Sequence, residues 1–299
     1  MSDKETIRPD GNIIPSSPAD PTIRQPSSII GSSPGVSQSP APSLSNGSIT
    51  LNGNTYEISG HIASMGEAEV YKALMGNQWV IIKYYFNNFS PNHEIVEKLK
   101  GFTHPDIIGL LDTAWHLNRF VEVQEYAQGG SLADCLPERD EKQLSHIVRE
   151  VIEALNACHQ QGIIHRDIKP GNIFYRKKGK DDVVIGDFGI SSPLKPGESL
   201  KLTRRFLTQS YAAPELLTGI NTKAFIGKEV DFYSLGITLI HLWTGNDPFG
   251  NLPDYETTRL KLDGRVPLPD DLSQRLLLLI KGLLTIEPSK RWGYKEVND

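Results

Sequence analysis

The stretch IIHRDIKPGNIF, residues 163–174, places three polar side chains among isoleucines. Asp167, Lys169 and Asn172 follow one another at offsets of two and three. The preceding residues, 141–162, carry apolar side chains at helical spacing and end in glycine, which predicts a long amphipathic helix. Taken alone, the polar residues also fit an ordinary turn between a helix and a strand.

A second acidic turn indicates that these residues form a functional site rather than an ordinary connection between a helix and a strand. In VVIGDFGIS, residues 183–191, Asp187 follows a short apolar strand. Asn172 offers an amide oxygen and Asp187 a carboxylate, which are ligands that Mg²⁺ prefers, with water and phosphates completing its shell. Asp167 could then accept a proton from a hydroxyl, and Lys169 could face developing negative charge. The two turns together predict phosphoryl transfer.

These residues lie in motifs that resemble the eukaryotic-type (Hanks-type) serine/threonine protein kinase family. The motifs are His165-Arg166-Asp167 with Lys169 and Asn172, Asp187-Phe188-Gly189, and Ala213-Pro214-Glu215. The resemblance covers the chain from about residue 55 to its last residue. It implies an α+β, two-lobed fold, with a small antiparallel β-rich N-lobe that has one main helix and a larger, mostly helical C-lobe.

The distribution of residue types along the chain fits this organisation. Residues 1–48 are rich in proline and serine and lack aromatic residues, which predicts a disordered tail. Alternating apolar runs predict strands at 49–58, 69–74, 79–85 and 120–126, and residues 90–100 read as a helix. We therefore expect a tail at 1–48, an N-lobe at 49–125 and a C-lobe at 126–299. The family usually continues into another helix near Asp299, which leaves open whether the natural protein continues.

The resemblance implies a role for each residue of the site. Asp167 matches the catalytic base, Lys169 the partner of the γ-phosphate of ATP, and Asn172 and Asp187 the ligands of Mg²⁺, with Mn²⁺ as an alternative ion. Lys83, at a strand end upstream, matches the lysine on the α- and β-phosphates. In the segment QEYAQGGSL, backbone groups of the residues at 125 and 127 would bond the adenine. That segment makes Glu125 and Ala127 the expected hinge contacts and Gln124 the gatekeeper.

The glycine-rich loop departs from the family pattern. Counting back from Val70 puts Ala63, Met65 and Ala68 at the three glycine positions, so that Gly66 is the one glycine inside the loop. Gly66, Ala68 and Val70 are still expected to cover the nucleotide. Side chains at glycine positions restrict φ and keep backbone N–H groups from phosphate, so nucleotide affinity could be modest.

The helix glutamate that should pair with Lys83 is also displaced. Counting from His104, the family position falls on Ile95, and Glu94 and Glu97 flank it. A shift of one residue turns a side chain by about 100° on a helix. We expect Glu94 to be the partner of Lys83, with Glu97 as the alternative.

Further matches concern architecture and regulation. Asp231 matches the buried aspartate that holds the catalytic loop, and Glu215 and Arg291 match a buried ion pair of the C-lobe. The polar segment between the second and third motifs resembles an activation loop. Within it, Thr208 matches the threonine near the catalytic aspartate in members that act on Ser or Thr, and Thr203 is a candidate phosphorylation site.

The tail contains a short repeat. TIRPDGNII and TIRQPSSII start at Thr6 and Thr22 and share their first three and last two residues. A chance echo in low-complexity sequence explains this repeat equally well. The alternative is a duplicated motif whose phosphorylated threonines are read by a protein partner.

Composition restricts the remaining classes. The net charge of −5 gives no basic excess for binding nucleic acid or acidic membranes. The longest apolar runs are too short to cross a bilayer, and the N-terminus lacks the apolar core of a signal peptide. Two cysteines are too few for a disulfide framework, which fits a reducing, cytoplasmic location.

Three functions remain. The first is an ATP-dependent Ser/Thr protein kinase that phosphorylates its activation loop, its tail and protein substrates. The second is a pseudokinase scaffold, favoured by the glycine-poor loop and the displaced helix glutamate. The third is a small-molecule kinase of the aminoglycoside or choline type, which Lys169 and the Ala-Pro-Glu motif disfavour.

Overall fold

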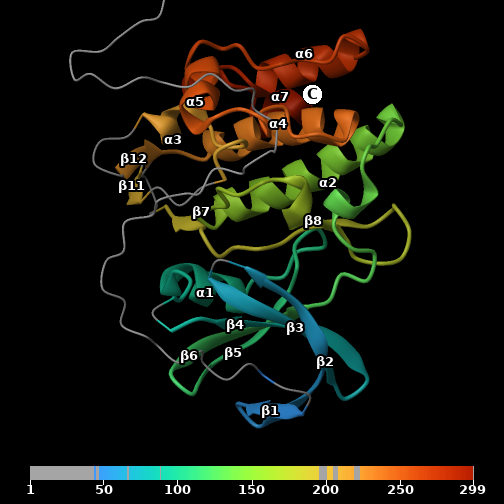
Figure 1. Ribbon diagram of the computed structural model, residues 1–299, viewed down its shortest axis with the longest axis vertical. Coiled ribbons are helices and arrows are strands. Elements are labelled where there is room, and N and C mark those ends of the chain that lie inside the picture. Colours follow the sequence, from blue (N-terminus) through green and yellow to red (C-terminus); the bar gives the residue numbers. More distant parts are fainter. Residues whose placement is uncertain are drawn as a thin grey trace, which may run out of the picture. The chain divides into compact units, whose positions relative to one another are not determined.

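The computed structural model describes Leu44 and residues 47–65, 67–87, 89–194, 201–204, 208–218 and 223–298 (Figure 1). These residues belong to one compact unit that starts at Pro42. They form an N-lobe built on one sheet and a mostly helical C-lobe, which confirms the predicted α+β, two-lobed fold. Apart from Leu44, Gly47 and Ser48, the predicted tail lies outside the described residues.

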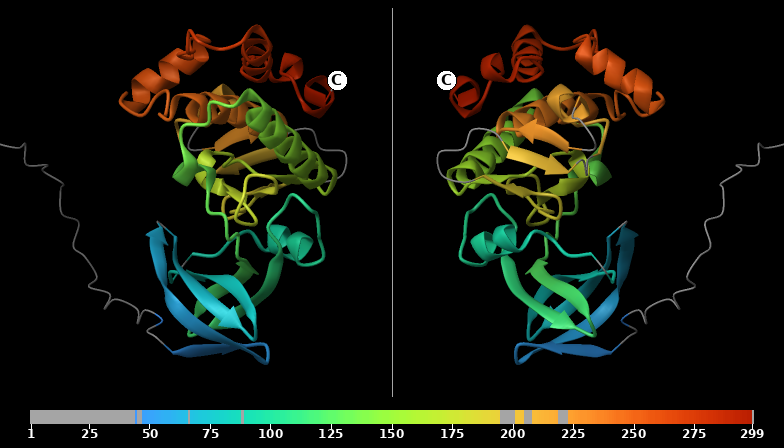
Figure 2. Two further views of the ribbon diagram at one scale, coloured as in Figure 1. Left: turned by 90° about the vertical axis from the view of Figure 1, so that its right-hand side faces the viewer. Right: turned by 90° about the vertical axis from the view of Figure 1, so that its left-hand side faces the viewer.

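The N-lobe is an antiparallel sheet of six strands in the order β1-β2-β3-β4-β6-β5, and Figure 2 shows its curvature from two sides. The strands are β1 (Ser48–Leu51), β2 (Asn54–Met65), β3 (Ala68–Met75), β4 (Gln78–Tyr85), β5 (Leu110–His116) and β6 (Arg119–Glu125). Alternate residues of β4, namely Val80, Ile82 and Tyr84, are buried in the core of this lobe, as the period of a strand requires. Strand β5 was not predicted, because most of its side chains are only partly buried and it lacks an apolar alternation.

Helix α1 (His93–Lys100) lies between the sheet and the C-lobe (Figure 1). It starts later than predicted, because the side chain of Asn92 accepts a hydrogen bond from the backbone N–H of Glu94 and caps the helix. Its buried residues are Ile95, Val96 and Leu99. This register decides which side chains of the helix can reach the site.

The C-lobe is organised around two long helices, α2 (Glu141–Gln160) and α4 (Glu229–Thr244). Helix α2 ends as predicted, and Gly162 follows it with a φ of 66°, a conformation that glycine adopts at low cost. Helix α4 is apolar around most of its circumference because Leu235 and Leu239 face one core cluster, while Tyr233 and Ile237 face another. The other helices are α3 (Pro214–Leu217), α5 (Asp254–Leu262), α6 (Gln274–Leu283) and α7 (Tyr294–Asn298), with 3₁₀ turns at Leu132–Cys135, Pro170–Asn172 and Pro288–Lys290.

Short strand pairs complete the C-lobe. β7 (Ile163–Ile164) pairs with β10 (Ser192–Pro193), β8 (Ile173–Tyr175) with β9 (Val183–Ile185), and β11 (Lys201–Arg204) with β12 (Lys223–Ile226). Strand β11 lies in the part of the chain expected to be the activation loop, and β12 follows that part. No helix in the described ranges is both long and apolar enough to cross a membrane.

Candidate active site

A β-hairpin brings the two acidic turns together. Strands β8 and β9 pair antiparallel with Ile173 opposite Ile185, so the residue before β8 and the residues after β9 leave the hairpin at the same end. Asn172 stands directly before β8 and Asp187 comes two residues after β9. The backbone N–H of Gly186 donates to the carbonyl oxygen of Asn172 at 2.9 Å and closes this end.

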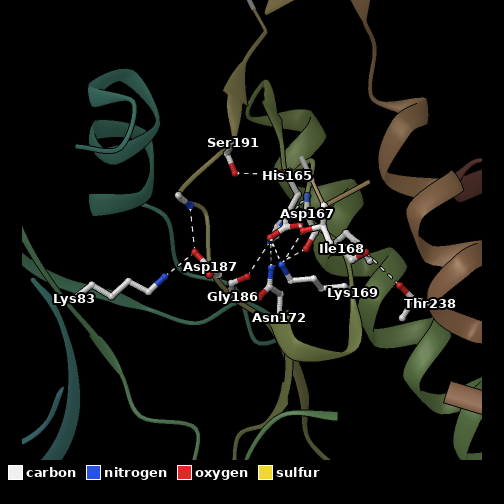
Figure 3. Close-up of polar contacts among 12 residues, drawn as sticks. Lys83, His165, Asp167, Ile168, Lys169, Asn172, Gly186, Asp187, Ser191 and Thr238 are labelled. Carbon is white, nitrogen blue, oxygen red and sulfur yellow. Dashed lines mark hydrogen bonds and ion pairs between the residues drawn. The ribbon is translucent and has the colours of Figure 1, made fainter. Parts of the chain in front are cut away.

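Asp167 is the centre of a hydrogen-bonded cluster beside the hairpin (Figure 3). Its Oδ2 accepts from Nζ of Lys169 at 2.7 Å and from Nδ2 of Asn172 at 2.8 Å. Its Oδ1 accepts from the hydroxyl of Thr208 at 2.8 Å, and Lys169 donates to the same hydroxyl oxygen at 3.0 Å. The side chain of Asp167 is 12% exposed, so the carboxylate is fixed but still reachable. A carboxylate that already accepts a hydrogen bond from one alcohol group has the geometry of a base for a hydroxyl substrate.

The loop that carries Asp167 is held by Asp231, which is completely buried at the start of α4. Its Oδ1 accepts from the backbone N–H of Arg166 at 2.6 Å, and its Oδ2 from that of His165 at 2.9 Å. His159 on α2 lies 2.8 Å from the same Oδ2. Burial by itself raises the pKa of Asp231, but these donors, with His159 first, outweigh burial and lower it.

The sequence analysis gave His159 no role in the site. Its partner lies 72 residues away on α4, and no spacing in the sequence reports such a pairing. His165 connects the two turns, because its Nε2 donates to the carbonyl oxygen of Gly186 at 3.0 Å and its Nδ1 accepts from the backbone N–H of Asp167 at 3.3 Å. Burial lowers the pKa of His165, which fits the neutral ring that this bonding pattern needs.

Lys83 reaches from β4 to Asp187, with Nζ 2.7 Å from Oδ1 (Figure 3). Burial alone would raise the pKa of Asp187, but the Lys83 ammonium outweighs it and lowers the pKa to about 2. Oδ1 also faces the backbone N–H of Gly189 at 3.4 Å, whereas Oδ2 accepts no hydrogen bond from any described residue. The amide oxygen of Asn172 is likewise unbonded within the described ranges.

The two unbonded oxygens fit a hard cation. They offer one carboxylate and one amide oxygen, and Mg²⁺ usually takes few protein ligands and leaves its other positions to water and phosphates. No group of three or more His, Cys, Asp or Glu side chains in the described part of the chain is arranged to hold a metal ion. The donor set therefore suits an ion that arrives with a phosphate ligand better than a closed protein cage.

A cavity of about 650 Å³ opens beside these residues. Asn172, Asp187 and Lys83 line one side of it, and the strand exit after β6 lines another through Gln124, Glu125, Tyr126 and Ala127. Val70 of β3 and Phe174 of β8 contribute apolar surface. The size and the mixture of apolar walls with a few polar groups are typical of a site for a nucleotide-sized ligand.

The comparisons with known proteins agree with this geometry. The model of the protein kinase domain matches residues 62–299. The chain belongs to the protein kinase family. The relatives found include "Sperm motility kinase 2B" of Mus musculus, 34% identical over 205 residues that make up 68% of this chain and 41% of the relative. "Serine/threonine protein kinase OSK3" of Oryza sativa subsp. indica is 31% identical over 251 residues, which are 80% of this chain and 47% of the relative. This kinase chain thus spans less than half the length of these curated relatives.

The predicted helix partner of Lys83 is not the one found in this kinase. Glu94 lies 3.5 Å from Lys98, and its side chain is 48% exposed, while Lys83 pairs with Asp187. Glu97, the alternative, pairs with Lys100 at 2.8 Å and is 67% exposed. Ile95 occupies the buried face of α1 with 1% exposure, and Glu94 and Glu97 are turned from it by about 100° and about 200°. The predicted pairing of Glu94 with Lys83 was therefore wrong.

The loop over the cavity is a tight hairpin between β2 and β3. Of its predicted nucleotide contacts, Val70 lines the cavity and Gly66 lies outside the described residues. Ala68 is buried in a small cluster with Tyr85, Val96 and Phe120, and it is not among the residues that line the cavity. The methyl group packs inward because β3 has already begun at Ala68.

Glu67, at the tip of the same hairpin, was missed by the sequence analysis. Its carboxylate lies beside Gly189, where Oε1 occupies the space that a Cβ atom at that residue would need. Burial raises the pKa of Glu67, Asp187 adds to the rise, and Lys83 partly opposes it. An acidic side chain thus stands where a glycine-rich loop would offer backbone N–H groups.

The structure places one of the two activation-loop threonines in the site. Thr208 contacts Asp167, as described above. Thr203 lies in β11, where its backbone is paired with that of Ala224, and its side chain lies outside the described part of the structure.

The segment after Thr208 is held by a lysine that the sequence analysis did not select. Lys261 of α5 is completely buried and donates from Nζ to the carbonyl oxygens of Gln209, Ser210 and Ala212 at 2.8, 2.6 and 2.8 Å. In the sequence, Lys261 is simply a polar residue of a mixed helix.

Arg291 and Glu215 form the expected ion pair, and the contact is bidentate. Nη1 of Arg291 lies 2.7 Å from Oε1 of Glu215, and Nη2 lies 3.0 Å from Oε2. The remaining donors of the guanidinium go to the carbonyl oxygens of Glu229, Thr285 and Ile286. All five N–H groups of this buried arginine are therefore used.

Proposed function

We propose that this chain is an ATP-dependent protein kinase that transfers the γ-phosphate of ATP to Ser or Thr hydroxyls. The observation that carries the proposal is the cluster around Asp167, in which a carboxylate, an ammonium group and a threonine hydroxyl lie within 3.0 Å of one another. Thr208 provides the hydroxyl, and the same chemical group would be presented by a substrate. Several of the matching relatives carry "serine/threonine protein kinase" in their names, which supports the same substrate class.

Each residue has a defined task in the proposed reaction. Asp167 accepts the proton of the substrate hydroxyl as its oxygen bonds to the γ-phosphorus and the bond from that phosphorus to the bridging oxygen breaks, releasing ADP. Lys169 offsets negative charge on the transferred group, and Lys83 orients the α- and β-phosphates. Asn172 and Asp187 would hold Mg²⁺, or Mn²⁺ in its place. The ion neutralises phosphate charge when it is bound.

The adenine is proposed to lie between the apolar walls of the cavity. Val70 would cover one face of the ring, and backbone groups of Glu125 and Ala127 would bond its edge. The backbone N–H of Glu125 donates to the carbonyl oxygen of Gly109 at 2.9 Å, so the free backbone group at this position is its carbonyl.

We also propose that the kinase phosphorylates itself at Thr203 and in its tail at Thr6 and Thr22. These threonines stand beside arginine or in a repeated motif, and a phosphothreonine-reading protein would be the partner of the tail.

A direct experiment tests the proposal. The purified chain is incubated with Mg·ATP and a mixture of Ser-, Thr- and Tyr-containing peptides, and phosphorylated sites are identified by mass spectrometry. Phosphate on Ser or Thr in the wild type, and none in an Asp187→Asn variant, is the expected result. Phosphate confined to tyrosine, or equal labelling in both proteins, would contradict the assignment. An unmodified Thr6 and Thr22 after strong labelling elsewhere would reject the tail sites alone.

A pseudokinase scaffold is the second candidate. The observation that favours it is Glu67, whose negative charge lies against Gly189 beside the metal-binding aspartate and disfavours a polyphosphate. A scaffold would bind a protein partner with the same affinity in the wild type and in the Asp187→Asn variant, without transferring phosphate in either. The labelling experiment above therefore separates the two candidates.

A further inference from the structure

In the part of the chain that the structure describes, Lys83 forms no ion pair with a residue of α1, because Glu94 and Glu97 pair with lysines of the same helix. Asp187 is the residue that neutralises Lys83 in the structure, yet Asp187 is also the proposed metal ligand. A carboxylate that binds a cation holds a lysine less strongly, because the two positive charges compete for it. Another carboxylate must then fix the position of the ammonium group.

Glu122 is placed for this task on the neighbouring strand. In the pairing of β4 with β6, Lys83 and Glu122 are direct cross-strand partners. Directly opposite residues of an antiparallel pair point to the same face and have Cβ atoms about 4.5–5.5 Å apart. Glu122 is 5% exposed, which is unusual for a carboxylate on a strand without a cation beside it.

Its own contacts hold the carboxylate and leave one oxygen available. The hydroxyl of Tyr85 donates to Oε2 of Glu122 at 3.2 Å, and Nε2 of Gln124 donates to the same oxygen at 3.0 Å. Oε1 accepts no hydrogen bond from the residues that the structure describes. Burial raises the pKa of Glu122, and the first opposing influence is the charge of Lys83.

We propose that Glu122 replaces the helix glutamate of the family as the positioning residue for Lys83. The lysine and its partner then stand on adjacent strands of one sheet, so their alignment does not depend on where α1 lies. Glu67 is less suited to this role, because it stands at the tip of a hairpin over the phosphate site rather than within the sheet. The proposal rests on the proposed function for its activity readout, but its nucleotide-binding readout does not.

The test compares matched variants of the whole chain. Glu122→Gln removes the charge but keeps an oxygen for Tyr85 and Gln124, and Glu122→Asp keeps the charge on a shorter side chain. Glu57→Gln, an exposed position of the same sheet, is the control. For each protein we would measure the melting temperature, the dissociation constant of Mg·ATP by calorimetry, and kcat and KM for a peptide substrate.

The expected result is a loss of nucleotide affinity and of kcat by about tenfold each in Glu122→Gln, and a smaller loss in Glu122→Asp. Glu57→Gln should match the wild type. In a Lys83→Met background the further change Glu122→Gln should leave nucleotide affinity unaltered, because the charge has lost the group that it positions. A purely structural Glu122 would instead lower the melting temperature of both backgrounds equally and change nucleotide affinity in both.

Other outcomes would overturn the inference in distinguishable ways. Suppose that the wild type transfers phosphate, that Glu122→Gln has the same activity as the wild type, and that Glu94→Gln loses activity. The helix glutamate would then be the residue that positions Lys83. If the wild type binds Mg·ATP without transferring phosphate, the proposed function fails. The Mg·ATP affinities of the Lys83 and Glu122 single and double variants would still test whether Glu122 positions Lys83. Should Glu122→Gln not fold, an unchanged affinity in Glu122→Asp combined with loss in Glu94→Gln would refute the proposal as well.

Discussion

Replacing Asp231 by asparagine should uncouple the catalytic loop from the helical core. The carboxylate accepts two backbone N–H groups and one histidine nitrogen at 2.6–2.9 Å, from Arg166, His165 and His159. Asparagine has a single acceptor oxygen, so in either orientation its NH₂ group faces one of these donors. The orientation that keeps His165 and His159 bonded leaves the N–H of Arg166 unsatisfied in a site with no exposed surface.

The magnitude follows from these contacts. A hydrogen bond to a charged group contributes about 1.5–3 kcal/mol, and a buried unsatisfied donor costs about 1–3 kcal/mol. The retained bonds also weaken when the charge is lost, so we expect the free energy of unfolding to fall by about 3 kcal/mol. With about 2–4 °C per kcal/mol for a chain of this size, the melting temperature should drop by about 6–12 °C. Because the loop then shifts Asp167, kcat should fall about a hundredfold.

Urea denaturation followed by circular dichroism gives the free energies, and hydrogen exchange reports the amides of Arg166 and His165 directly. The pKa of Asp231 is lower in the folded than in the unfolded chain, so its contribution is present above the unfolded value of 3.8 and is lost as the pH falls through the folded pKa. The difference between the two proteins should therefore be constant from about pH 5 to 8 and shrink in acid. Asp270→Asn, an exposed aspartate on the same lobe, serves as the control and should change stability by less than about 0.5 kcal/mol. Equal stability of wild type and Asp231→Asn, with unchanged amide protection, would refute the reasoning.

Three further substitutions have defined outcomes. Arg291→Met should lower the free energy of unfolding by about 3–5 kcal/mol in guanidinium titrations, because it leaves Glu215 without its buried partner; a loss below about 1 kcal/mol would contradict this. Glu67→Gln should lower the KM for ATP several-fold in steady-state assays, since it removes a negative charge beside the proposed phosphate site, and an increase in KM would show that the carboxylate helps to bind nucleotide. Asp106→Asn should stabilise the fold at pH 7.5 by about 1 kcal/mol, a value reduced for solvent screening, and by less at pH 4. The reason is that burial and Glu150 raise the pKa of Asp106 to about 6, so the wild type loses stability as the pH rises from 4 to 6. Thermal melts should therefore show the melting temperatures of the two proteins moving together as the pH falls from 6 to 4. A difference that stays constant over this range would contradict the reasoning.

The sequence predicted most of the fold and the centre of the site, for a physical reason. Asp167, Asn172 and Asp187 stand in short turns beside apolar strands, and a single hairpin brings the turns together. Their relation is therefore local enough to be read from spacing. The long helix α2 was equally accessible, because its apolar period and terminal glycine are properties of the chain itself.

Contacts between distant elements could not be predicted in this way. Glu122 reads as an ordinary polar position in an alternating strand, and the register of β4 against β6 is what places it opposite Lys83. The wrong choice of Glu94 has the same origin, because one residue of helix phase decides which side chain faces the core. Lys261 looks like a surface lysine until α5 is packed against residues 209–212.

Among the described residues, five other than glycine have a positive φ, and three of them are in hairpin turns of the N-lobe. The other two are Arg166 and Asp187, with φ of 72° and 64°, on either side of the proposed reaction centre. A left-handed backbone costs a residue with a side chain about 1–2 kcal/mol, so glycine at either position would relax the chain. At Asp187 this conformational cost cannot be relieved without losing the ion pair with Lys83, so a thermostable form of this kinase has to be sought at other positions.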